Sequence, residues 1–362
     1  MVLTNDILKK KPLILAIDTS CDDTSVALVR GREVISSEIS SQTELHSEFG
    51  GIVPDLARRL HEENIQEVYD RALNNNPGMI NNVDYIAVTI GPGLAIDLEV
   101  GIKFAKELSL RYGKPLVPVN HMEGHLLSPI LLNSKGNGLV DNNSLINAFP
   151  SLGLLMSGKH TEIIYIEEIG KYRKLGETLD DAAGEAFDKV GRMLNLGYPG
   201  GPVVTEFAKR GKSGVISFTT PMKNSKDLNF SFSGLKTAAL YRSNEIREKG
   251  IPEKEWIYDF CRGFLDAVID SVTGKLTMAI QMHPEVKSVF VGGGVFNSEE
   301  ILRKVGNTVR SYNLNYYYPE IEYRSDNAAM IAVAGYVDIL QNMIVTDKKS
   351  IENVDREPRL SL

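Results

Sequence analysis

The sequence predicts an α/β protein with mostly parallel sheets, built from two similar halves. Apolar strand-like runs alternate with helical patterns along the chain, which is typical of this class. A unit of strand, polar turn and strand occurs at residues 13–29 and again at 152–166. Two copies of one unit favour a duplicated domain, although two unrelated hairpins would give the same pattern.

The two units place hydroxyl and tight-turn residues between buried strands. The first has apolar runs at 13–18 and 26–29 around the turn 19–24. The second has runs at 152–156 and 163–166 around the turn 157–161. Each therefore predicts a strand–turn–strand unit with polar groups at its tip.

Helices are predicted between the strands. Pro54 suits a first helical position, and Leu56, Leu60, Ile65 and Val68 form a buried stripe. Apolar residues at i, i+4 spacing over 256–276 predict a long core helix. Buried strands at 83–90 and 287–291 run into glycine loops. The Asn- and Gly-rich stretch 133–144 predicts a loop at the lobe boundary. We therefore expect an N-terminal lobe of 1–146 and a C-terminal lobe of 147–325, with residues 326–362 packing back on the N-terminal lobe.

Composition narrows the function classes. The chain has 362 residues, a net charge of −7 and two cysteines. An acidic chain does not hold nucleic acid by charge alone, and two cysteines make neither a disulfide framework nor a four-cysteine metal site. A short apolar run follows Lys9–Lys11, but Asp18 interrupts it and no small-residue cleavage site follows. We therefore expect a cytoplasmic protein with no membrane span.

His121 and His125 form the first chemical motif. Four residues turn a helix by about 400°, so both imidazoles share one face and could bind one metal ion. Two histidines satisfied by backbone and water are the alternative. A zinc peptidase is disfavoured, because its glutamate must directly follow the first histidine and Glu123 lies on the opposite face.

The segment 325–327 could add a third ligand. Ser325 suits an N-cap, which would place Asp326 in the first helical turn. The carboxylate would then either bind the metal or only complement the helix dipole.

Three glycine loops, at 91–94, 200–202 and 292–294, each follow an apolar segment and lead into a predicted helix. Backbone amides at a helix start can hold phosphate, although glycine often serves only a turn. Together with the two polar hairpins, the loops indicate a nucleotide cleft between two lobes.

Two further segments allow a functional or a plain surface interpretation. Asp181, Gly184, Glu185 and Asp188 are predicted on one helix face, where they would bind ribose or a cation or merely be solvated. Lys236 opens a helix and suits an anion. Nearby basic residues could contact a nucleic-acid backbone or be ordinary surface; they are Lys209, Arg210, Lys212, Lys223, Lys226 and Arg242.

These motifs, taken in order over residues 13–340, resemble the tRNA threonylcarbamoyladenosine transferase family, called TsaD in bacteria. The matching segments are 18–24, 50–57, 91–94, 120–125, 176–181, 200–202, 232–236 and 325–327. Glu123 between the histidines resembles the bacterial and organellar branch.

The resemblance implies an actin-like (ASKHA) ATPase fold with two ribonuclease-H-like lobes around a nucleotide cleft. It implies transfer of threonylcarbamoyl from L-threonylcarbamoyladenylate to adenosine-37 of tRNAs that read codons starting with A, with release of AMP. It implies one divalent metal, Fe(II) or Zn(II), on His121, His125 and Asp326. Expected partners are tRNA, a TsaB-like paralogous subunit and a TsaE-like small ATPase; homodimerisation is left open.

Asp22 and Asp23 lie near the first hairpin turn and are candidates for proton handling or for ordering the cleft, and His160 is a further expected catalytic residue. The resemblance assigns ligand-binding roles to other residues. Expected adenylate-binding residues are Leu155, Met156, Ser157, Gly158, Lys159, Asp188, Gly201, Thr205, and Asn297 or Ser298.

The chain departs from the family pattern in three places. Lys159 replaces a glycine and either adds a phosphate contact or crowds its turn. Asp97 and Glu99 place acid after the first glycine loop, and Asn297 comes one position early. These departures motivate one alternative, a catalytically inactive nucleotide-binding subunit of the same complex. A sugar or carboxylate kinase of the same fold is a further alternative.

Overall fold

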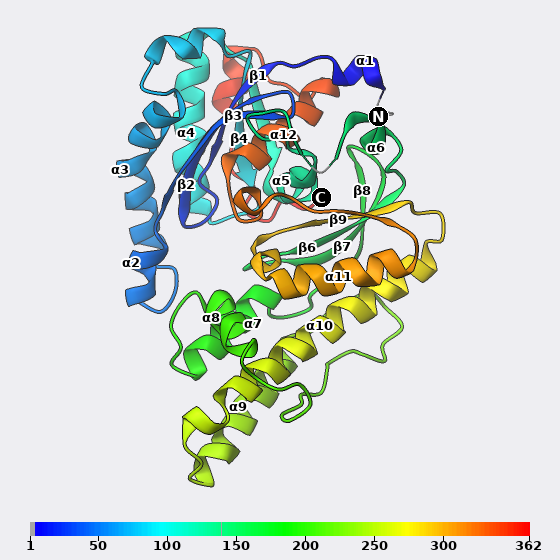
Figure 1. Cartoon of the computed structure of the whole chain (residues 1–362). Helices are drawn as coiled ribbons and strands as arrows, with labels where there is room; N and C mark the ends of the chain where they lie inside the picture. The colour runs from blue at the N-terminus through cyan, green and yellow to red at the C-terminus, as the bar shows by residue number, and fades with distance from the viewer. Residues whose placement is uncertain (1–3, 139) are drawn as a thin grey trace. The chain divides into compact units, whose positions relative to one another are not determined.

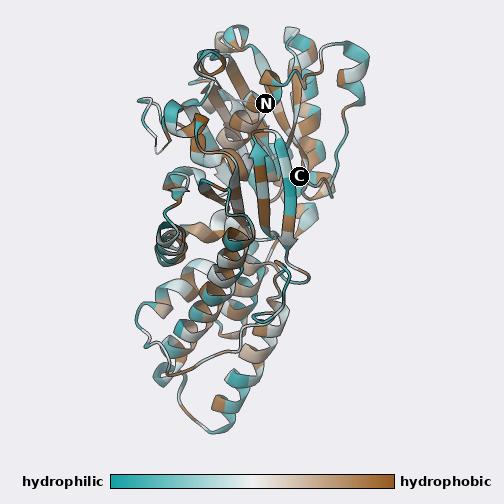
Figure 2. Ribbon diagram, turned by 90° about the vertical axis from the view of Figure 1, so that its right-hand side faces the viewer, coloured by the Kyte–Doolittle hydropathy of each residue, from teal (hydrophilic) through white to brown (hydrophobic). Residues whose placement is uncertain are grey.

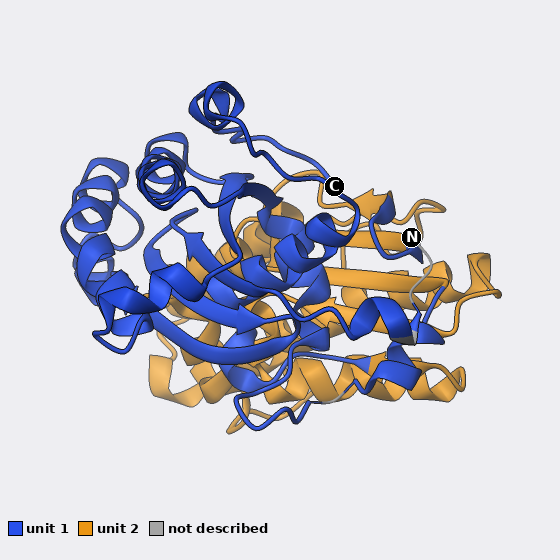
Figure 3. Cartoon of the chain, turned by 90° about the horizontal axis from the view of Figure 1, so that it is seen from above, with its two compact units in different colours: residues 1–149, 166–172, 317–362 blue, residues 150–165, 173–316 orange. Residues whose placement is uncertain are grey.

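The computed structural model describes residues 4–138 and 140–362 and divides into two compact units (Figures 1 and 3). Unit 1 comprises residues 1–149, 166–172 and 317–362, and unit 2 comprises 150–165 and 173–316. The domain division expected from the sequence, at 146/147 and 325/326, stays a prediction.

A five-stranded sheet organises unit 1, in the order β3-β2-β1-β4-β5. Its strands are β1 (Leu13–Asp18), β2 (Asp23–Arg30), β3 (Glu33–Ser41), β4 (Tyr85–Gly91) and β5 (Leu116–Asn120). β1 pairs antiparallel with β2 and parallel with β4, β2 pairs antiparallel with β3, and β4 pairs parallel with β5. The prediction of a mostly parallel sheet is wrong here, because short turns join β1 to β2 and β2 to β3, and such turns permit only antiparallel pairing.

Helices cover this sheet and close its core. They are α1 (Asn5–Leu8), α2 (Thr43–Glu48), α3 (Pro54–Ala72), α4 (Ala95–Tyr112), α5 (His121–Leu127), α6 (Asn142–Ile146), α12 (Ala328–Leu340) and α13 (Lys348–Asn353). α12 packs against β1, β2 and β5, and α3 packs against β2 and α4. The stripe predicted on α3 supplies Ile65 and Val68 to a core that also contains Leu15 and Ile17 of β1.

The second sheet has the order β10-β9-β6-β7-β8. Its strands are β6 (Ser151–Met156), β7 (Thr161–Glu168), β8 (Lys171–Glu177), β9 (Ser288–Gly292) and β10 (Asn315–Tyr317). The unit 2 helices are α7 (Ala183–Met193), α8 (Gly200–Ala208), α9 (Ser233–Glu248), α10 (Ile257–Met282) and α11 (Glu299–Ser311). The long core helix is confirmed as α10, and its Phe264 ring meets the Phe187 ring of α7 edge-on at 5.3 Å.

The two sheets repeat one strand order. Read from its other edge, the second sheet is β8-β7-β6-β9-β10, which matches β3-β2-β1-β4-β5 strand for strand. β6 and β9 pair in parallel, as do their counterparts β1 and β4. The duplication that the two hairpins predicted is therefore present in the topology.

The distribution of hydropathy fits this architecture. Many strands are hydrophobic and a few are hydrophilic, while the long helices alternate hydrophobic and hydrophilic stretches (Figure 2). Among the described residues, no helix has both the length and the apolar character needed to cross a bilayer.

Candidate metal centre and adenylate-binding segments

Helix α5 carries both histidines of the first motif. Asn120 caps it by accepting hydrogen bonds from the amides of Met122 (2.8 Å) and Glu123 (3.4 Å). The two imidazole rings have centroids 4.8 Å apart and lie nearly perpendicular to each other. The predicted helix, and the shared face of His121 and His125, are confirmed.

Asp326 reaches this pair from a different position than predicted. The N-cap of α12 is Asn327, whose side chain accepts from the Met330 amide at 2.9 Å, and not Ser325. Asp326 therefore precedes the helix instead of lying in its first turn. This start is fixed by packing, because the amide of Ala328 donates to the Ser25 hydroxyl at 2.9 Å. The Asp326 carboxylate is thereby available to the two histidines.

The three side chains converge on one point. Asp326 Oδ1 lies 3.1 Å from His125 Nε2 and 3.6 Å from His121 Nε2, and candidate ligand atoms of all three lie within 4.8 Å of one another. Both ring nitrogens of His125 are buried; Nε2 contacts Asp326, and Nδ1 has no hydrogen-bond partner among the described residues. Two imidazoles and one carboxylate suit Zn(II) or Fe(II), so these residues fit the implied metal.

The ionisation of His121 and the ionisation of Asp326 depend strongly on each other. Burial alone would lower the pKa of His121, but the carboxylates of Asp18 and Asp326 outweigh it and raise that pKa to about 10. Burial opposes ionisation of Asp326 as well, yet the two imidazoles hold the pKa of Asp326 well below its ordinary value. The cluster thus keeps the half-buried Asp326 carboxylate ionised beside two buried imidazoles.

Two residues that the sequence analysis did not assign orient His121. Ser20 Oγ lies 3.1 Å and Asp18 Oδ2 lies 3.5 Å from its Nδ1, which leaves Nε2 directed toward Asp326. A carboxylate on the second ring nitrogen is the usual support of a metal-binding histidine. The strand order is the signal that indicates this support. β1 and β5 each pair in parallel with β4, so the carboxyl ends of β1 and β5, which carry Asp18 and precede His121, share one sheet edge.

The turn that contains Asp22 and Asp23 is held by a buried histidine. His61 Nε2 lies 2.8 Å from the Cys21 carbonyl, and His61 Nδ1 lies 2.7 Å from Thr24 Oγ1. Burial raises the pKa of Asp23 to about 7, and the charges of Asp22, Asp326 and Asp18 add to this, while a bond from Ser41 opposes it. Asp23 is therefore a carboxyl group that can exchange a proton near neutral pH.

In unit 2, the turn 157–160 joins β6 to β7. Ser157 Oγ accepts from the amides of Lys159 (3.3 Å) and His160 (3.1 Å), which closes the turn. The side chains of Leu155 and Met156 are fully buried, so only their backbone could contact a ligand. Lys159 is exposed and has no positive φ, so it does not crowd the turn.

The predicted residues on α7 and α8 are linked to each other. The amide of Gly200 donates to Asp188 Oδ1 at 2.7 Å, and Thr205 Oγ1 donates to the Gly201 carbonyl at 2.8 Å. Gly200 packs so closely that an added Cβ would lie 2.3 Å from the Phe187 carbonyl oxygen. Asp188 thus anchors the start of α8 through one carboxylate oxygen.

The third glycine loop lies against β6. Gly293 has φ +104, and an added Cβ would lie 2.3 Å from the Met156 carbonyl oxygen. A short 3-10 turn, Gly294–Asn297, follows and leads into α11. Asn297 is exposed and Ser298 is half-buried, so both stay candidates for ligand contact.

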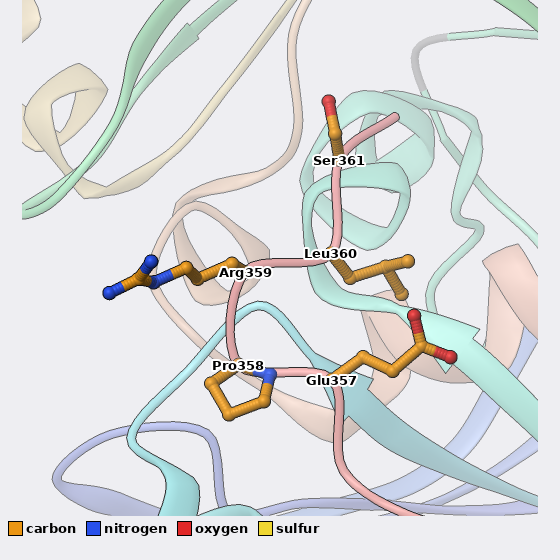
Figure 4. Close-up of a pocket in the computed structure, with 5 residues that line it drawn as sticks. All are labelled: Glu357, Pro358, Arg359, Leu360 and Ser361. Atoms are coloured by element: carbon orange, nitrogen blue, oxygen red, sulfur yellow. The ribbon is translucent and has the colours of Figure 1, made fainter.

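The first glycine loop is not arranged as the phosphate cradle that its sequence suggested. Gly93 N donates to the Pro358 carbonyl at 3.3 Å, and Leu94 N donates to the Ser20 carbonyl at 2.9 Å. The C-terminal segment 357–361 lies over this loop, and Figure 4 shows Arg359 extending to the side opposite Glu357 and Leu360. The loop amides are thus already used within unit 1.

We expect Gly91→Ala to dislodge this C-terminal segment. A Cβ at Gly91 would lie 1.8 Å from the Glu357 carbonyl oxygen, so the segment must move. Hydrogen exchange should show lost protection of the Glu357 amide, which donates to the Ile90 carbonyl at 2.7 Å. Gly274→Ala, where nothing lies within 4 Å, is the control and should leave that amide protected. Unchanged protection in Gly91→Ala would contradict the packing.

Two charged segments are mostly neutralised within unit 2. Asp181 precedes α7 instead of sharing its face, and its two oxygens bind Lys189 (2.6 Å) and Lys236 (2.9 Å). The prediction of one acidic helix face is therefore wrong for Asp181, and Lys236 already has an anionic partner. In the basic group, Lys209 pairs with Glu206, Arg242 pairs with Glu245, and Arg210 lies over the Tyr258 ring.

The opposite face of α5 carries a buried acid. Glu123 accepts a hydrogen bond from the Tyr172 hydroxyl at 2.6 Å, and burial raises the pKa of Glu123 to about 7. Asp338 of α12 is buried beside it. Burial, with the charge of Glu123 added, raises the pKa of Asp338 to about 8. Glu123 therefore faces away from the histidines, as the helix geometry predicted.

Asp338→Asn should stabilise the protein, and more so at pH 8 than at pH 5. Unfolded Asp ionises near 3.8, whereas folded Asp338 keeps its proton up to about 8, so stability falls as pH rises through that window. The variant lacks this penalty and should gain at least about 1 kcal/mol at pH 8. Urea unfolding at the two pH values measures the gain. Asp270→Asn on the exposed side of α10 is the control, and an equal gain for Asp338→Asn at both pH values would refute the account.

Fold and site together define the class of protein: an actin-like ATPase fold of two related sheets, with a candidate His–His–Asp metal centre in unit 1. HypF from T. kodakarensis has a similar structure, with a TM-score of 0.59 and 14% identity over 94% of this chain and 50% of that chain. At that identity the likeness concerns the fold alone.

Sequence comparison gives the family. The family model "TsaD: tRNA N6-adenosine threonylcarbamoyltransferase" matches residues 33–333. The relative so named from Thermodesulfovibrio yellowstonii is 42% identical over 92% of this chain and 96% of its own length. The relative from Thermosipho africanus is 40% identical over 90% and 93%. The chain belongs to the tRNA N6-adenosine threonylcarbamoyltransferase family, whose substrate is tRNA.

Proposed function

We propose that this chain transfers the threonylcarbamoyl group of L-threonylcarbamoyladenylate to N6 of adenosine-37 in tRNAs that read codons starting with A, and that AMP is released. Family membership supports the transferase activity. The convergence of His121, His125 and Asp326 is the structural observation that carries the proposal for this chain.

His121, His125 and Asp326 would hold one divalent ion, Fe(II) or Zn(II). The convergence of their donor atoms and the burial of both histidines support this. When bound, the ion would supply Lewis-acid chemistry for an acyl donor. Ser20 and Asp18 contact Nδ1 of His121, so the orientation of its ring is set before any ligand arrives.

The donor is a mixed anhydride and is already activated, so the chain needs no covalent nucleophile. Its tasks are to position the amine, to stabilise charge on the carbonyl oxygen and to accept the amine proton. Asp23 suits the last task, because its raised pKa places it near the optimum for a base at neutral pH. Asp22 would order the turn between β1 and β2, and His160 would be a further catalytic residue in the turn between β6 and β7.

Unit 2 would bind the adenylate. The backbone of Leu155 and Met156, and the turn formed by Ser157, Gly158, Lys159 and His160, would contact the nucleotide. The remaining expected contacts come from Asp188, Gly201, Thr205, Asn297 and Ser298. The exposed Lys159 ammonium suits a phosphate contact, and the open turn at Gly158 supports ligand access, since an added Cβ there would meet nothing within 4 Å.

The expected context is a cytoplasmic multi-protein system. A net charge of −7 supports tRNA binding that depends on partner proteins, for which a TsaB-like paralogous subunit and a TsaE-like small ATPase are proposed. A homodimer is a further form to test. The two lobes would be 1–146 with 326–362, and 147–325.

Reconstitution tests this function. Purified metal-loaded chain with its partners, synthetic L-threonylcarbamoyladenylate and unmodified tRNA should yield threonylcarbamoyladenosine, detected by nucleoside mass spectrometry. Product that persists unchanged with His121→Ala would favour the inactive-subunit alternative. ATP hydrolysis stimulated by a small acceptor, without tRNA modification, would favour a kinase.

A further inference from the structure

Unit 1 contains a cavity of about 540 Å³ that the transfer reaction does not use. It lies against the side of α5 that carries Glu123, away from the shared face of the histidines. The polar side chains of its lining include Asn120, Glu123, Tyr172, Asp338 and Gln341. Its apolar side chains include Ile90, Ile344, Val345 and Leu360.

The polar side chains of the lining include two buried carboxyl groups. Glu123 is 7% exposed and Asp338 is 4% exposed. Glu123 accepts from the Tyr172 hydroxyl at 2.6 Å. Among the described residues no hydrogen bond to the Asp338 carboxyl is found, and the charge of Glu123 acts on it. An unpartnered carboxyl group in such a position indicates a missing donor.

The described lining residues supply no positive charge to these acids. Buried carboxylates are normally paired with a cation, because an isolated charge in a low-dielectric site is costly. Two neighbouring carboxyl groups, both facing one cavity, therefore create a strong preference for a cation that carries N–H donors. The volume lies within the roughly 300–1,000 Å³ range of small-molecule sites.

The lining distinguishes an organic cation from a metal ion. Calcium and magnesium need about six to eight oxygen ligands or bound waters around the whole ion. The described lining offers only two acidic side chains, Glu123 and Asp338, beside several aliphatic ones. An ammonium head with a short alkyl stem matches this mixture, since its head can donate to the acids while its methylene groups contact the aliphatic side chains.

We propose that this cavity binds a small primary alkylammonium ion, with its head between Glu123 and Asp338 and its stem against Ile90, Val345 and Leu360. The Tyr172 hydroxyl and the Gln341 amide border the head. The site is separate from the His121–His125–Asp326 cluster and does not depend on the proposed reaction.

Titration calorimetry of the metal-loaded full chain with n-butylammonium tests this proposal. We expect saturable 1:1 binding, with 1-butanol and n-butyltrimethylammonium binding at least about tenfold more weakly, since they lack the charge or the N–H donors. Equal binding of 1-butanol would show a merely apolar cavity, and Mg²⁺ binding without amine binding would show a metal site. Either result, or no saturable heat from n-butylammonium, would overturn the proposal.

A variant pair localises the binding. Asp338→Asn keeps the side-chain volume but removes a carboxyl group that can release its proton and pair with the ammonium head, and it should weaken n-butylammonium binding about 30-fold or more. Asp270→Asn on α10 is the matched control and should bind as the unchanged chain does. If Asp338→Asn bound n-butylammonium with unchanged affinity, the ammonium head would lie elsewhere. The ligand series on the unchanged chain decides the proposal even if Asp338→Asn folds poorly.

Discussion

His125→Ala is expected to lower metal content to background and to reduce tRNA modification at least about 100-fold. His125 contributes one of the three converging side chains, and both its ring nitrogens are buried, with Nε2 in contact with Asp326. Loss of a supporting residue alone typically costs 10–100-fold in metal affinity or activity, so loss of a direct ligand should cost more. Elemental analysis by mass spectrometry and nucleoside analysis of the product measure both effects.

His283→Ala is the matched control for this substitution. His283 lies at the end of α10 in unit 2 and contacts Glu285 at 3.2 Å. It should leave metal content and modification near those of the unchanged chain. If His125→Ala retained full metal content, the assignment of the His121–His125–Asp326 cluster would be wrong.

Gly293→Ala should destabilise unit 2 by about 3 kcal/mol or more and weaken binding of the adenylate. Its φ of +104 is a conformation that alanine rarely adopts, and its Cβ would lie 2.3 Å from the Met156 carbonyl oxygen. Backbone strain of this kind costs about 1–3 kcal/mol, and overpacking adds a similar amount. The single tryptophan, Trp256, is buried in unit 2, so its fluorescence during urea unfolding reports on this unit.

The control for Gly293 separates strain from collision. Gly214 also has a positive φ, of +83, but nothing lies within 4 Å of an added Cβ. Gly214→Ala should cost only about 1 kcal/mol. Equal destabilisation by the two variants would show that the contact between Gly293 and β6 does not matter.

Local patterns predicted much of the fold. The strand at 13–18, the helix that begins at Pro54 and the long helix after Trp256 each follow from periodicity and a local start signal. The repeated hairpins predicted the duplicated topology. The prediction of mostly parallel pairing was wrong because alternating strands and helices are typical of parallel sheets, whereas the short turns that join β1, β2 and β3 impose antiparallel pairing.

The start of α12 shows where local signals fail. Ser325 and Asn327 are both good N-cap residues, and the local sequence does not choose between them. The hydrogen bond from the Ala328 amide to Ser25, which is distant in sequence, makes that choice. The outcome matters for chemistry because it leaves Asp326 outside the helix and beside His125.

The candidate site was only partly predictable for the same reason. The spacing of His121 and His125 on one helix is a local property, so the sequence predicts their shared face. The support from Asp18 and Ser20 depends on the sheet that brings the end of β1 to the start of α5. The pairing of Glu123 with Asp338 depends on the packing of α5 against α12, so neither relation has a sequence motif.

Anomalous diffraction from a crystal of the metal-loaded protein, recorded at the absorption edge of the bound ion, tests the central claim most directly. We expect one strong peak about 2.0–2.2 Å from a ring nitrogen of His121, a ring nitrogen of His125 and a carboxylate oxygen of Asp326. An ion bound elsewhere in a chain that still modifies tRNA would contradict the account.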